Sequence, residues 1–298
     1  MTTTASAPTP DPASDLAPGT SPSTAPSTSP GLLIEVDGRP ATEADLRLRA
    51  LDTYGHFTAL QIRDGRTRGM DLHLARLDAA TRELFGAGLD GERVRAALRH
   101  ALDGVRDASA RVYVHWRDEA NGVPGPGGPT GAGDPSLMVT VRPPAVLDRR
   151  PRSMMSVPYQ RPVPHIKHLG GFAQIHYGRV ARVAGFTDAL LTGPGGVVSE
   201  GAIANIGFWD GASVVWPDAP ALTGVTMALL EPRLPAAGIS SVRRAVTLAD
   251  LPLFRTAFVT NSQGIAPVGR IDETVFPGDA ELLKTVTEVY EGVEWDDI

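Results

Sequence analysis

The sequence predicts an α+β protein of two domains. Candidate strands and amphipathic helices are mixed in both halves, without the regular strand–helix–strand alternation of a doubly wound sheet or a barrel. The chain has 298 residues, which exceeds the size that a single hydrophobic core usually serves. The pair Pro143-Pro144 is typical of a hinge, so we expect an N-terminal domain over 31–142 and a C-terminal domain over 146–298.

The first thirty residues have the composition of a disordered tail. They hold seven prolines among Ser, Thr and Ala, with neither a basic start nor an apolar run of signal-peptide length. We therefore expect 1–30 to be disordered and the protein to be soluble and cytoplasmic. The net charge of −6 argues against a nucleic-acid partner, and no stretch has the apolar length of a membrane span. The lack of cysteine excludes disulfides and thiol chemistry.

Apolar periodicity and turn residues define the elements of the N-terminal domain. Strands are expected over 32–36, 56–62, 66–70, 111–116 and 136–142, and helices over 71–85 and 91–102. Asp71 is the expected N-cap of the first helix, and Gly86 its stop. The Gly/Pro-rich segment 121–134 is expected to be irregular, either an active-site lid or a solvated insertion.

The C-terminal domain is expected to contain more strands than helices. Strands are expected over 153–157, 187–192, 197–199, 203–209, 212–216 and 256–261, and helices over 172–184, from 224 onward, and over 279–291. The first of these helices presents an apolar stripe of Phe172, Ile175, Val180 and Val183. Pro232 and Pro235 must end or kink the helix that begins near 224.

Lys167 is the strongest candidate for chemistry. Only two of the 28 Lys and Arg residues are lysines, Lys167 and Lys284. A lysine alone offers a primary amine whose pKa can fall on burial. Gly170 and Gly171 follow Lys167 closely and would let backbone approach a ligand. The pattern fits a lysine joined to a carbonyl cofactor, and the alternative is an ordinary half-buried lysine at a strand end.

Two other chemistries have weaker support. His165, His168 and His176 follow no common metal-ligand spacing and have no carboxylate among them, so we expect no metal site. The context of Ser199 is not that of a nucleophile elbow.

Five segments in a fixed order carry a family resemblance. They are His73–Leu77, Lys167, Val198–Gly201 with Asn205, Leu222–Thr226, and Val259–Ser262. Together they resemble the fold-type IV pyridoxal-phosphate enzymes, which include branched-chain aminotransferase, D-amino acid aminotransferase and aminodeoxychorismate lyase. The resemblance spans about 32–272 and implies that family's two-domain fold, with the cofactor in the cleft between the domains.

The resemblance implies a role for each motif. Lys167 would form the aldimine with pyridoxal 5'-phosphate and then move the substrate proton. Glu200 would pair with the pyridine nitrogen, the alternative being a solvated turn carboxylate. Arg76 would clamp the phosphate from the first domain. The remaining phosphate ligands would be Val225, Thr226, Asn261 and Ser262, although for the last two a polar turn after a strand is nearly as good an interpretation.

Substrate-binding residues follow less directly from the resemblance. The strand with Phe57 and Ala59 is similar to the Phe-Thr strand of the lyases, but Ala59 replaces a hydroxyl residue there. Phe172 stands where branched-chain aminotransferases carry a tyrosine. His115 and Arg117 alternate onto one strand face, near the place where relatives bind the substrate carboxylate, although Arg117 could equally be an exposed edge residue.

The resemblance therefore implies a pyridoxal-phosphate-dependent aminotransferase. It would exchange an amino group between an amino acid or amine donor and a 2-oxo acid acceptor, and it would be a homodimer as its relatives commonly are. One alternative is an aminodeoxychorismate-type lyase that releases pyruvate. The other is a catalytically silent relative that binds the cofactor or a partner protein.

Overall fold

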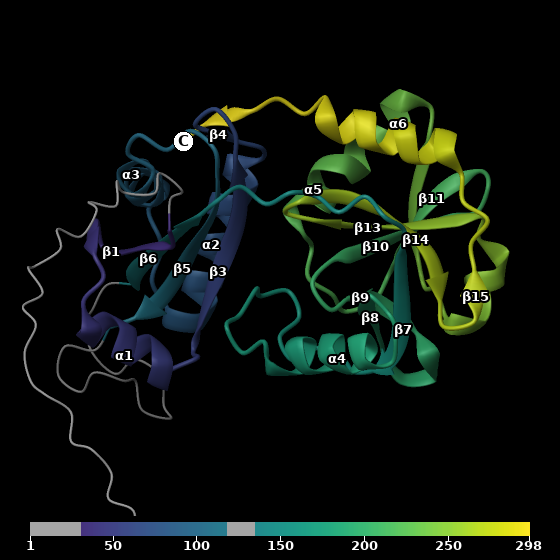
Figure 1. The fold of residues 1–298 in the computed structure, drawn as a ribbon, viewed down its shortest axis with the longest axis horizontal. Coiled ribbons are helices and arrows are strands. Elements are labelled where there is room, and N and C mark those ends of the chain that lie inside the picture. Colours follow the sequence, from purple (N-terminus) through teal and green to yellow (C-terminus); the bar gives the residue numbers. More distant parts are fainter. Residues whose placement is uncertain (1–30, 118–134) are drawn as a thin grey trace, which may run out of the picture.

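The structure is a computed structural model that describes residues 31–117 and 135–298. The expected tail and the Gly/Pro-rich segment 121–134 lie outside the described residues. Figure 1 shows two parts, each built around its own sheet, which we call the N-terminal half (31–142) and the C-terminal half (143–298). No helix in the described ranges is both long and apolar enough to cross a membrane.

The N-terminal half contains a five-stranded antiparallel sheet in the order β2-β1-β6-β5-β3. Its strands are β1 (Leu33–Val36), β2 (Arg39–Pro40), β3 (Gly55–Ile62), β5 (Ala108–Trp116) and β6 (Pro135–Arg142). Its helices are α1 (Glu43–Leu51), α2 (Met70–Phe85) and α3 (Gly91–Ala101).

One face of this sheet packs against α2 and α3, and the other faces the C-terminal half (Figure 1). The core between sheet and helices is built from side chains such as Leu60, Leu77 and Leu98. Alternate residues of β3 are buried and half-buried, because successive side chains in a strand point to opposite faces. The half-buried set, which includes Phe57 and Ala59, therefore lies on the face toward the C-terminal half.

The C-terminal half contains a nine-stranded mixed sheet in the order β12-β11-β10-β13-β14-β7-β8-β9, with β15 paired to β14. Its strands are β7 (Arg152–Pro158), β8 (Asp188–Thr192), β9 (Val198–Gly201), β10 (Asn205–Trp209), β11 (Ser213–Pro217), β12 (Ser240–Arg244), β13 (Thr256–Asn261), β14 (Gly264–Ile271) and β15 (Thr274–Val275). The last strand of the order, β9, also contacts β10, so the sheet curls into a half-barrel.

Helices and short 3₁₀ turns cover the outside of this half-barrel (Figure 1). They are α4 (Phe172–Val183), η1 (Pro194–Gly196), α5 (Val225–Leu230), η2 (Glu231–Ala237), η3 (Leu248–Leu253) and α6 (Ala280–Glu291). The α-helix α5 continues as a 3₁₀ helix from Glu231, and the sequence predicts this interruption from Pro232 and Pro235.

Residues 295–297, which follow α6, contact the N-terminal half. The short strand β16 (Asp296–Asp297) pairs with β4 (Arg66–Thr67), and the Asp296 carboxylate accepts from Met70 N at 2.8 Å. The guanidinium carbon of Arg68 lies 4.1 Å from the centroid of the Trp295 ring. The last residues of the C-terminal half are therefore docked on the start of α2 in the N-terminal half.

The order of helices and strands confirms the predicted α+β class, with two local corrections. The strand predicted over 66–70 stops at Thr67, and Asp71 is not an N-cap. Helix α2 begins one residue earlier, after Gly69 with φ +70°, because Asp296 from the far end of the chain satisfies the N–H of Met70. A cap supplied from so far along the chain has no local sequence signal.

The apolar stripe predicted on α4 is also placed differently. Phe172, Ile175 and Val183 are 79%, 70% and 82% exposed. Helix α4 instead packs through small residues, Gly178 and Ala181, against β7 and β8. Small side chains let the helix approach the sheet closely, and this leaves the bulky apolar side chains on the outer face.

Candidate active site

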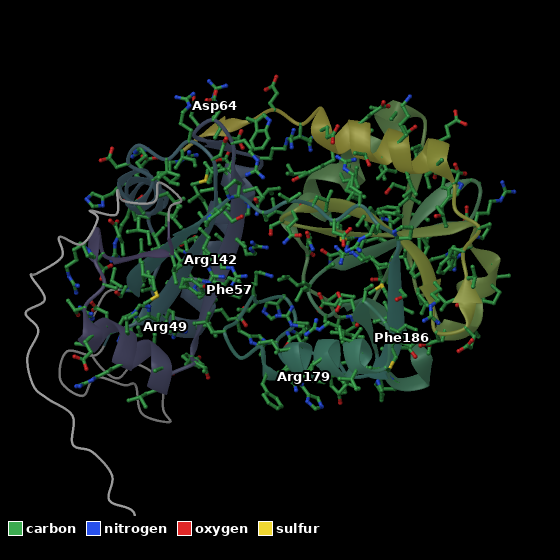
Figure 2. The ribbon with its side chains drawn as sticks, viewed as in Figure 1. Arg49, Phe57, Asp64, Arg142, Arg179 and Phe186 are labelled. Atoms are coloured by element: carbon green, nitrogen blue, oxygen red, sulfur yellow. The ribbon has the colours of Figure 1, made fainter. Side chains whose placement is uncertain are left out.

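A cavity of about 770 Å³ lies between the two halves. Its walls come from β3, β5 and α2 on one side, and from the segment before α4, β9, the start of α5 and the loop after β13 on the other. Figure 2 shows the side chains that fill this region, with Phe57 on the N-terminal half. Nine of the residues singled out from the sequence line it: Phe57, Ala59, Arg76, Lys167, Glu200, Val225, Thr226, Asn261 and Ser262.

Lys167 is held at the cavity wall by a backbone link between the two halves. Phe57 N donates to Lys167 O, and Leu169 N donates to Gly55 O, both at 2.9 Å. The segment thus pairs with β3 like a short extra strand. Gly55 leaves room for this segment, since a Cβ there would lie 3.0 Å from Leu169 Cδ1 and 2.6 Å from Val114 O of β5.

The Lys167 amine lies in surroundings that disfavour its charged form. Burial, together with the cations Arg76, Arg161 and Arg111, lowers the pKa of Lys167 to about 7, and Glu200 opposes this shift. Nζ lies 5.0 Å from the centroid of the Phe57 ring. A large share of this amine is therefore neutral near pH 7, which a nucleophile and a proton acceptor both require.

Glu200 lies on β9 at an irregularity of the sheet. Leu191 of β8 pairs with Glu200, and the next pair is Thr192 with Val198, so Ser199 is an extra residue in β9. Such a bulge re-aims the neighbouring side chain. Glu200 is 5% exposed and accepts two long hydrogen bonds, from Arg161 Nη1 and Leu222 N, both at 3.4 Å.

The surroundings of Glu200 leave its carboxylate able to accept a further hydrogen bond. Burial raises the pKa of Glu200, and Arg161 acts in the opposite direction. Because its two hydrogen bonds are long, the carboxylate keeps capacity for a further, shorter one. This is the property that a partner of a protonated ring nitrogen needs.

Arg161 is a site residue that the sequence analysis missed. Its side chain is 6% exposed, and it links Glu200 to the backbone beside the lysine, donating from Nη2 to Ile166 O at 2.9 Å. Its Nε is buried with no partner among the described residues. Arg161 lies between Gln160 and Pro162 in a segment without periodicity, so no pattern singled it out.

Arg76 approaches the cavity from α2. Its guanidinium donates to Thr58 Oγ1, which also bonds His73 Nδ1 at 2.6 Å. Burial lowers the pKa of Arg76 to about 10, and its Nε has no partner among the described residues. Arg76 is thus a buried cation bonded to a neutral hydroxyl, and an anion would compensate it.

The start of α5 supplies backbone N–H groups to the same cavity. Asn205 shapes the approach, because its Oδ1 accepts from Gly224 N at 2.9 Å and its Nδ2 donates to Leu222 O at 2.5 Å. A Cβ on Gly224 would lie 2.4 Å from Asn205 Oδ1, so only glycine fits. The first turn of α5 has no side-chain cap, and Thr226 Oγ1 donates to Asn261 O at 2.7 Å.

Two residues expected in the substrate site lie elsewhere. His115 is buried, with neither ring nitrogen bonded within the described residues, and Arg117 pairs with Asp45 on α1. Neither lines the cavity. The cavity-facing residues of β5 are Arg111 and Tyr113, which precede them at the same alternation. Strand β5 therefore lines the cavity through Arg111 and Tyr113, whereas His115 lies where β5 extends beyond it.

The donor set fits pyridoxal phosphate. That cofactor needs an amine for its aldehyde, an acid beside its ring nitrogen, and cations with N–H groups for its phosphate. Lys167, Glu200, Arg76 and the start of α5 offer these groups around one cavity. The buried, unbonded Arg76 Nε and Thr260 Oγ1 are polar atoms that a ligand would satisfy. No group of three or more potential metal ligands occurs in residues 31–117 and 135–298.

A half-barrel with a buried amine, a buried acid and a helix start around one cavity offers the groups that a phosphorylated aldehyde would require. The family model for class IV amino-transferases matches residues 55–271. The chain belongs to the class IV aminotransferase family, whose enzymes use pyridoxal phosphate. This confirms the predicted resemblance.

Solved structures of several family members have the same fold. 4-Amino-4-deoxychorismate lyase from Pseudomonas aeruginosa is 28% identical, with a TM-score of 0.70 over 86% of this chain and 97% of that one. Branched-chain amino acid aminotransferase from Escherichia coli is 18% identical, with a TM-score of 0.76 over 88% and 93%. The PLP-bound form of a hypothetical aminotransferase from Mycobacterium tuberculosis is 22% identical, with a TM-score of 0.68 over 83% and 90%. No curated protein matches significantly.

Proposed function

We propose that this protein is a pyridoxal-phosphate-dependent aminotransferase that exchanges an amino group between an amino acid or amine and a 2-oxo acid. The observation that carries the proposal is the buried Lys167 amine, with its pKa lowered to about 7, in the same cavity as Glu200 and Arg76. The proposal includes two domains, here the two halves, with the cofactor in the cavity between them.

Three groups of this chain would hold the cofactor. Arg76, together with the N–H groups of Val225 and Thr226, would bind the phosphate. Asn261 and Ser262 line the same part of the cavity and would complete that end. Glu200 would accept a hydrogen bond from the ring nitrogen and keep it protonated. When bound, pyridoxal phosphate supplies an aldehyde that condenses with amines and a ring that withdraws electrons from the substrate Cα.

Lys167 would do the acid–base work. In its neutral form Nζ can take the proton from the substrate Cα, and as the ammonium it can return a proton to the adjacent carbon. The lowered pKa suits both directions, because neither form is strongly favoured near pH 7. The Phe57 ring beside Nζ limits the water that reaches the amine.

The specific observation that favours a second reaction is the 28% identity to the Pseudomonas lyase. In that reaction the same lysine would serve, but the substrate would be cleaved with release of pyruvate. The two reactions are told apart by their requirements. A lyase releases pyruvate from its substrate without an acceptor, whereas an aminotransferase needs a 2-oxo acid to turn over.

The test is covalent trapping followed by a substrate screen. Borohydride treatment of the protein incubated with pyridoxal phosphate should place the pyridoxyl group on Lys167, and peptide mapping will locate it. A label on Lys284, or no label, would refute the assignment. Lys167→Ala should lower the transamination rate by several orders of magnitude, since one amine supplies covalent and proton-transfer catalysis. A protein that stays colourless with pyridoxal phosphate would support the catalytically silent alternative.

We also propose that the enzyme is a cytoplasmic homodimer. The outer face of α4 exposes Phe172, Ile175 and Val183, and Ile175 and the 67% exposed Ile203 reach the cavity rim. A second copy on this face would bury the apolar surface and close the rim. Light scattering should give twice the chain mass, and Ile175→Glu should shift it toward one chain mass. A monomeric wild type would contradict the proposal.

A further inference from the structure

The start of α2 packs directly against α5, so the two halves touch beside the cavity. Gly69, the residue before α2, lies so close to α5 that a Cβ there would be 3.0 Å from both Val225 Cγ1 and Leu229 Cδ1. Its φ of +70° is also one that glycine adopts without strain. Because Arg76 lies roughly two turns into α2 and Val225 opens α5, this contact determines how far apart the two lie in the cavity wall.

The cap of α2 comes from the other half of the molecule. Gly69 has no side chain that could accept from the first N–H groups of the helix. The Asp296 carboxylate takes that place and accepts from Met70 N at 2.8 Å, while the Asp296 backbone pairs with Thr67 through β16 and β4. Met70 is 1% exposed, so its N–H has little access to water as a substitute partner. A carboxylate also suits the positive end of the helix dipole.

Arg68 fixes the segment that carries Asp296. It donates from Nε to Val293 O at 2.9 Å and from Nη2 to Glu291 O at 2.8 Å. Its guanidinium carbon also lies 4.1 Å from the centroid of the Trp295 ring. A planar guanidinium that bonds two carbonyls and covers an aromatic ring leaves this segment little freedom. The acceptor for α2 is therefore presented at a defined position.

We propose that Asp296 is a positioning residue for cofactor binding: it holds the start of α2 against α5 and so fixes Arg76 where the cofactor phosphate requires it. Arg76 lines the cavity and Asp296 does not, so Asp296 would act through the helix rather than on the ligand. The inference rests on the proposed function for the identity of the ligand at Arg76. It predicts a coupling of Asp296 to the phosphate group alone, because Lys167 would hold the aldehyde and Glu200 the ring.

The experiment compares pyridoxal phosphate with pyridoxal, which lacks the phosphate, in absorbance titrations of the apoprotein. Asp296→Ala should weaken the binding of pyridoxal phosphate about tenfold, on the usual scale of coupling between two sites, and leave pyridoxal affinity unchanged. Asp296→Asn keeps an oxygen that can accept from Met70 N, so it should recover most of the loss. A merely structural Asp296 would lower stability and change both affinities alike. Equal changes for the two ligands, or no change, would overturn the inference.

Asp297→Ala is the matched control. Asp297 is the next residue of β16, but its side chain is 86% exposed and pairs with Arg66. Both ligands should bind this variant as they bind wild type. A loss of pyridoxal phosphate affinity as large as that of Asp296→Ala would overturn the inference, since the effect would then come from the strand and not from the cap.

A second measurement uses wild type alone and does not depend on how a variant folds. Coupling is reciprocal, so phosphate binding should in turn stabilise the Asp296 contact. At saturation, pyridoxal phosphate should slow hydrogen exchange in peptides over 66–73 and 293–298 more than pyridoxal does. Equal protection by the two ligands would contradict the inference. Failure of the proposed function is separate: it would appear as no pyridoxyl label on Lys167, whereas this inference would fail on a labelled protein.

Discussion

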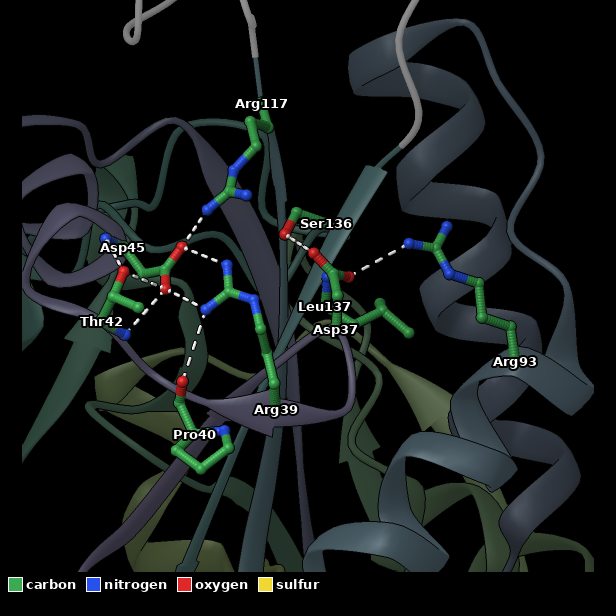
Figure 3. A network of polar contacts seen from close by, with 9 residues as sticks. All are labelled: Asp37, Arg39, Pro40, Thr42, Asp45, Arg93, Arg117, Ser136 and Leu137. Carbon is green, nitrogen blue, oxygen red and sulfur yellow. Dashed lines mark hydrogen bonds and ion pairs between the residues drawn. The ribbon is translucent and has the colours of Figure 1, made fainter.

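Two buried carboxylates, one in each half of the molecule, lie in opposite electrostatic situations. Asp45 on α1 is 1% exposed and receives bonds from Thr42, Arg39 and Arg117 (Figure 3). Its pKa is lowered well below the usual range, chiefly by the Arg39 bond. Glu200 on β9 is 5% exposed, has two long bonds, and its pKa is raised by burial.

We interpret the contrast as a structural role for Asp45 and, as proposed above, a functional one for Glu200. Asp45 is fully satisfied by its own chain: it closes a capping box at the start of α1 and joins that helix to Arg39 and to the end of β5. Glu200 has only two bonds within the described residues, both of 3.4 Å, so its carboxylate keeps capacity for a further donor. Burial with few partners is costly, so it persists where a ligand or reaction uses the group.

Among the variants that test this comparison, Glu200→Gln should produce the largest effect on activity and little effect on folding. An amide cannot keep a ring nitrogen protonated, so we expect the transamination rate to fall about 10²–10³-fold, as for loss of one preorganised electrostatic partner. The free energy of unfolding should stay level or rise, because the variant no longer buries a carboxylate. Steady-state kinetics measure the loss of rate, and urea unfolding measures the change in stability. A destabilised but fully active variant would reverse the assignment.

Asp45→Asn should show the opposite pattern. It leaves Arg39 and Arg117 without their carboxylate, but these side chains are 44% and 35% exposed, so we expect a loss of about 2–3 kcal/mol rather than the full cost of a buried pair. The rate of the folded fraction should match wild type. Urea unfolding measures the loss, and Glu43→Gln, which removes an exposed pair with Arg47, is the control with an expected change near zero. A large loss of rate at unchanged stability would place Asp45 in the site.

Variants of Arg161 test how Glu200 is kept ionised, because Arg161 is the only cation bonded to Glu200 within the described residues. Arg161→Met should raise the pKa of Glu200 further and leave it protonated over more of the working range. We expect about a tenfold loss of kcat with a shifted pH–rate profile, and Arg161→Lys should recover part of both. A purely structural Arg161 would lower stability without moving the profile. Unfolding curves for both variants separate these outcomes.

The sequence revealed the C-terminal half of the site better than the N-terminal half. Lys167, Glu200 and the start of α5 lie in short motifs, because each needs a local backbone feature: a glycine-flanked segment, a bulge and a helix start. Arg76 was identified from its helix motif. Arg111 and Tyr113 were missed in favour of His115 and Arg117, because strand alternation identifies a face but not how far along the strand the cavity extends.

Parts of the fold that depend on distant chain segments were also beyond sequence reasoning. The start of α2 depends on Asp296, more than two hundred residues away. Periodicity identified the apolar stripe on α4, but it shows only that one face is apolar and not which partner covers it, and the stripe lies on the exposed face. Such errors arise where tertiary or quaternary contacts outweigh local preference.

The smallest expected effect is a difference in acid sensitivity. The pKa of Asp45 is held below its ordinary value of 3.8, so the folded state keeps the carboxylate ionised where the unfolded chain already binds a proton. The stabilisation from Asp45 is therefore complete above about pH 5 and declines as the pH falls through 3.8 and below. Wild type and Asp45→Asn should differ most in unfolding free energy near pH 6 to 7, and the gap should narrow below pH 4. For Glu200 the sign is opposite: burial raises its pKa, so wild type should gain stability relative to Glu200→Gln as the pH falls and the carboxylate is protonated. Urea unfolding at pH 3.5, 4.5 and 6.5 tests this, and a gap that widens toward low pH would contradict the account of Asp45.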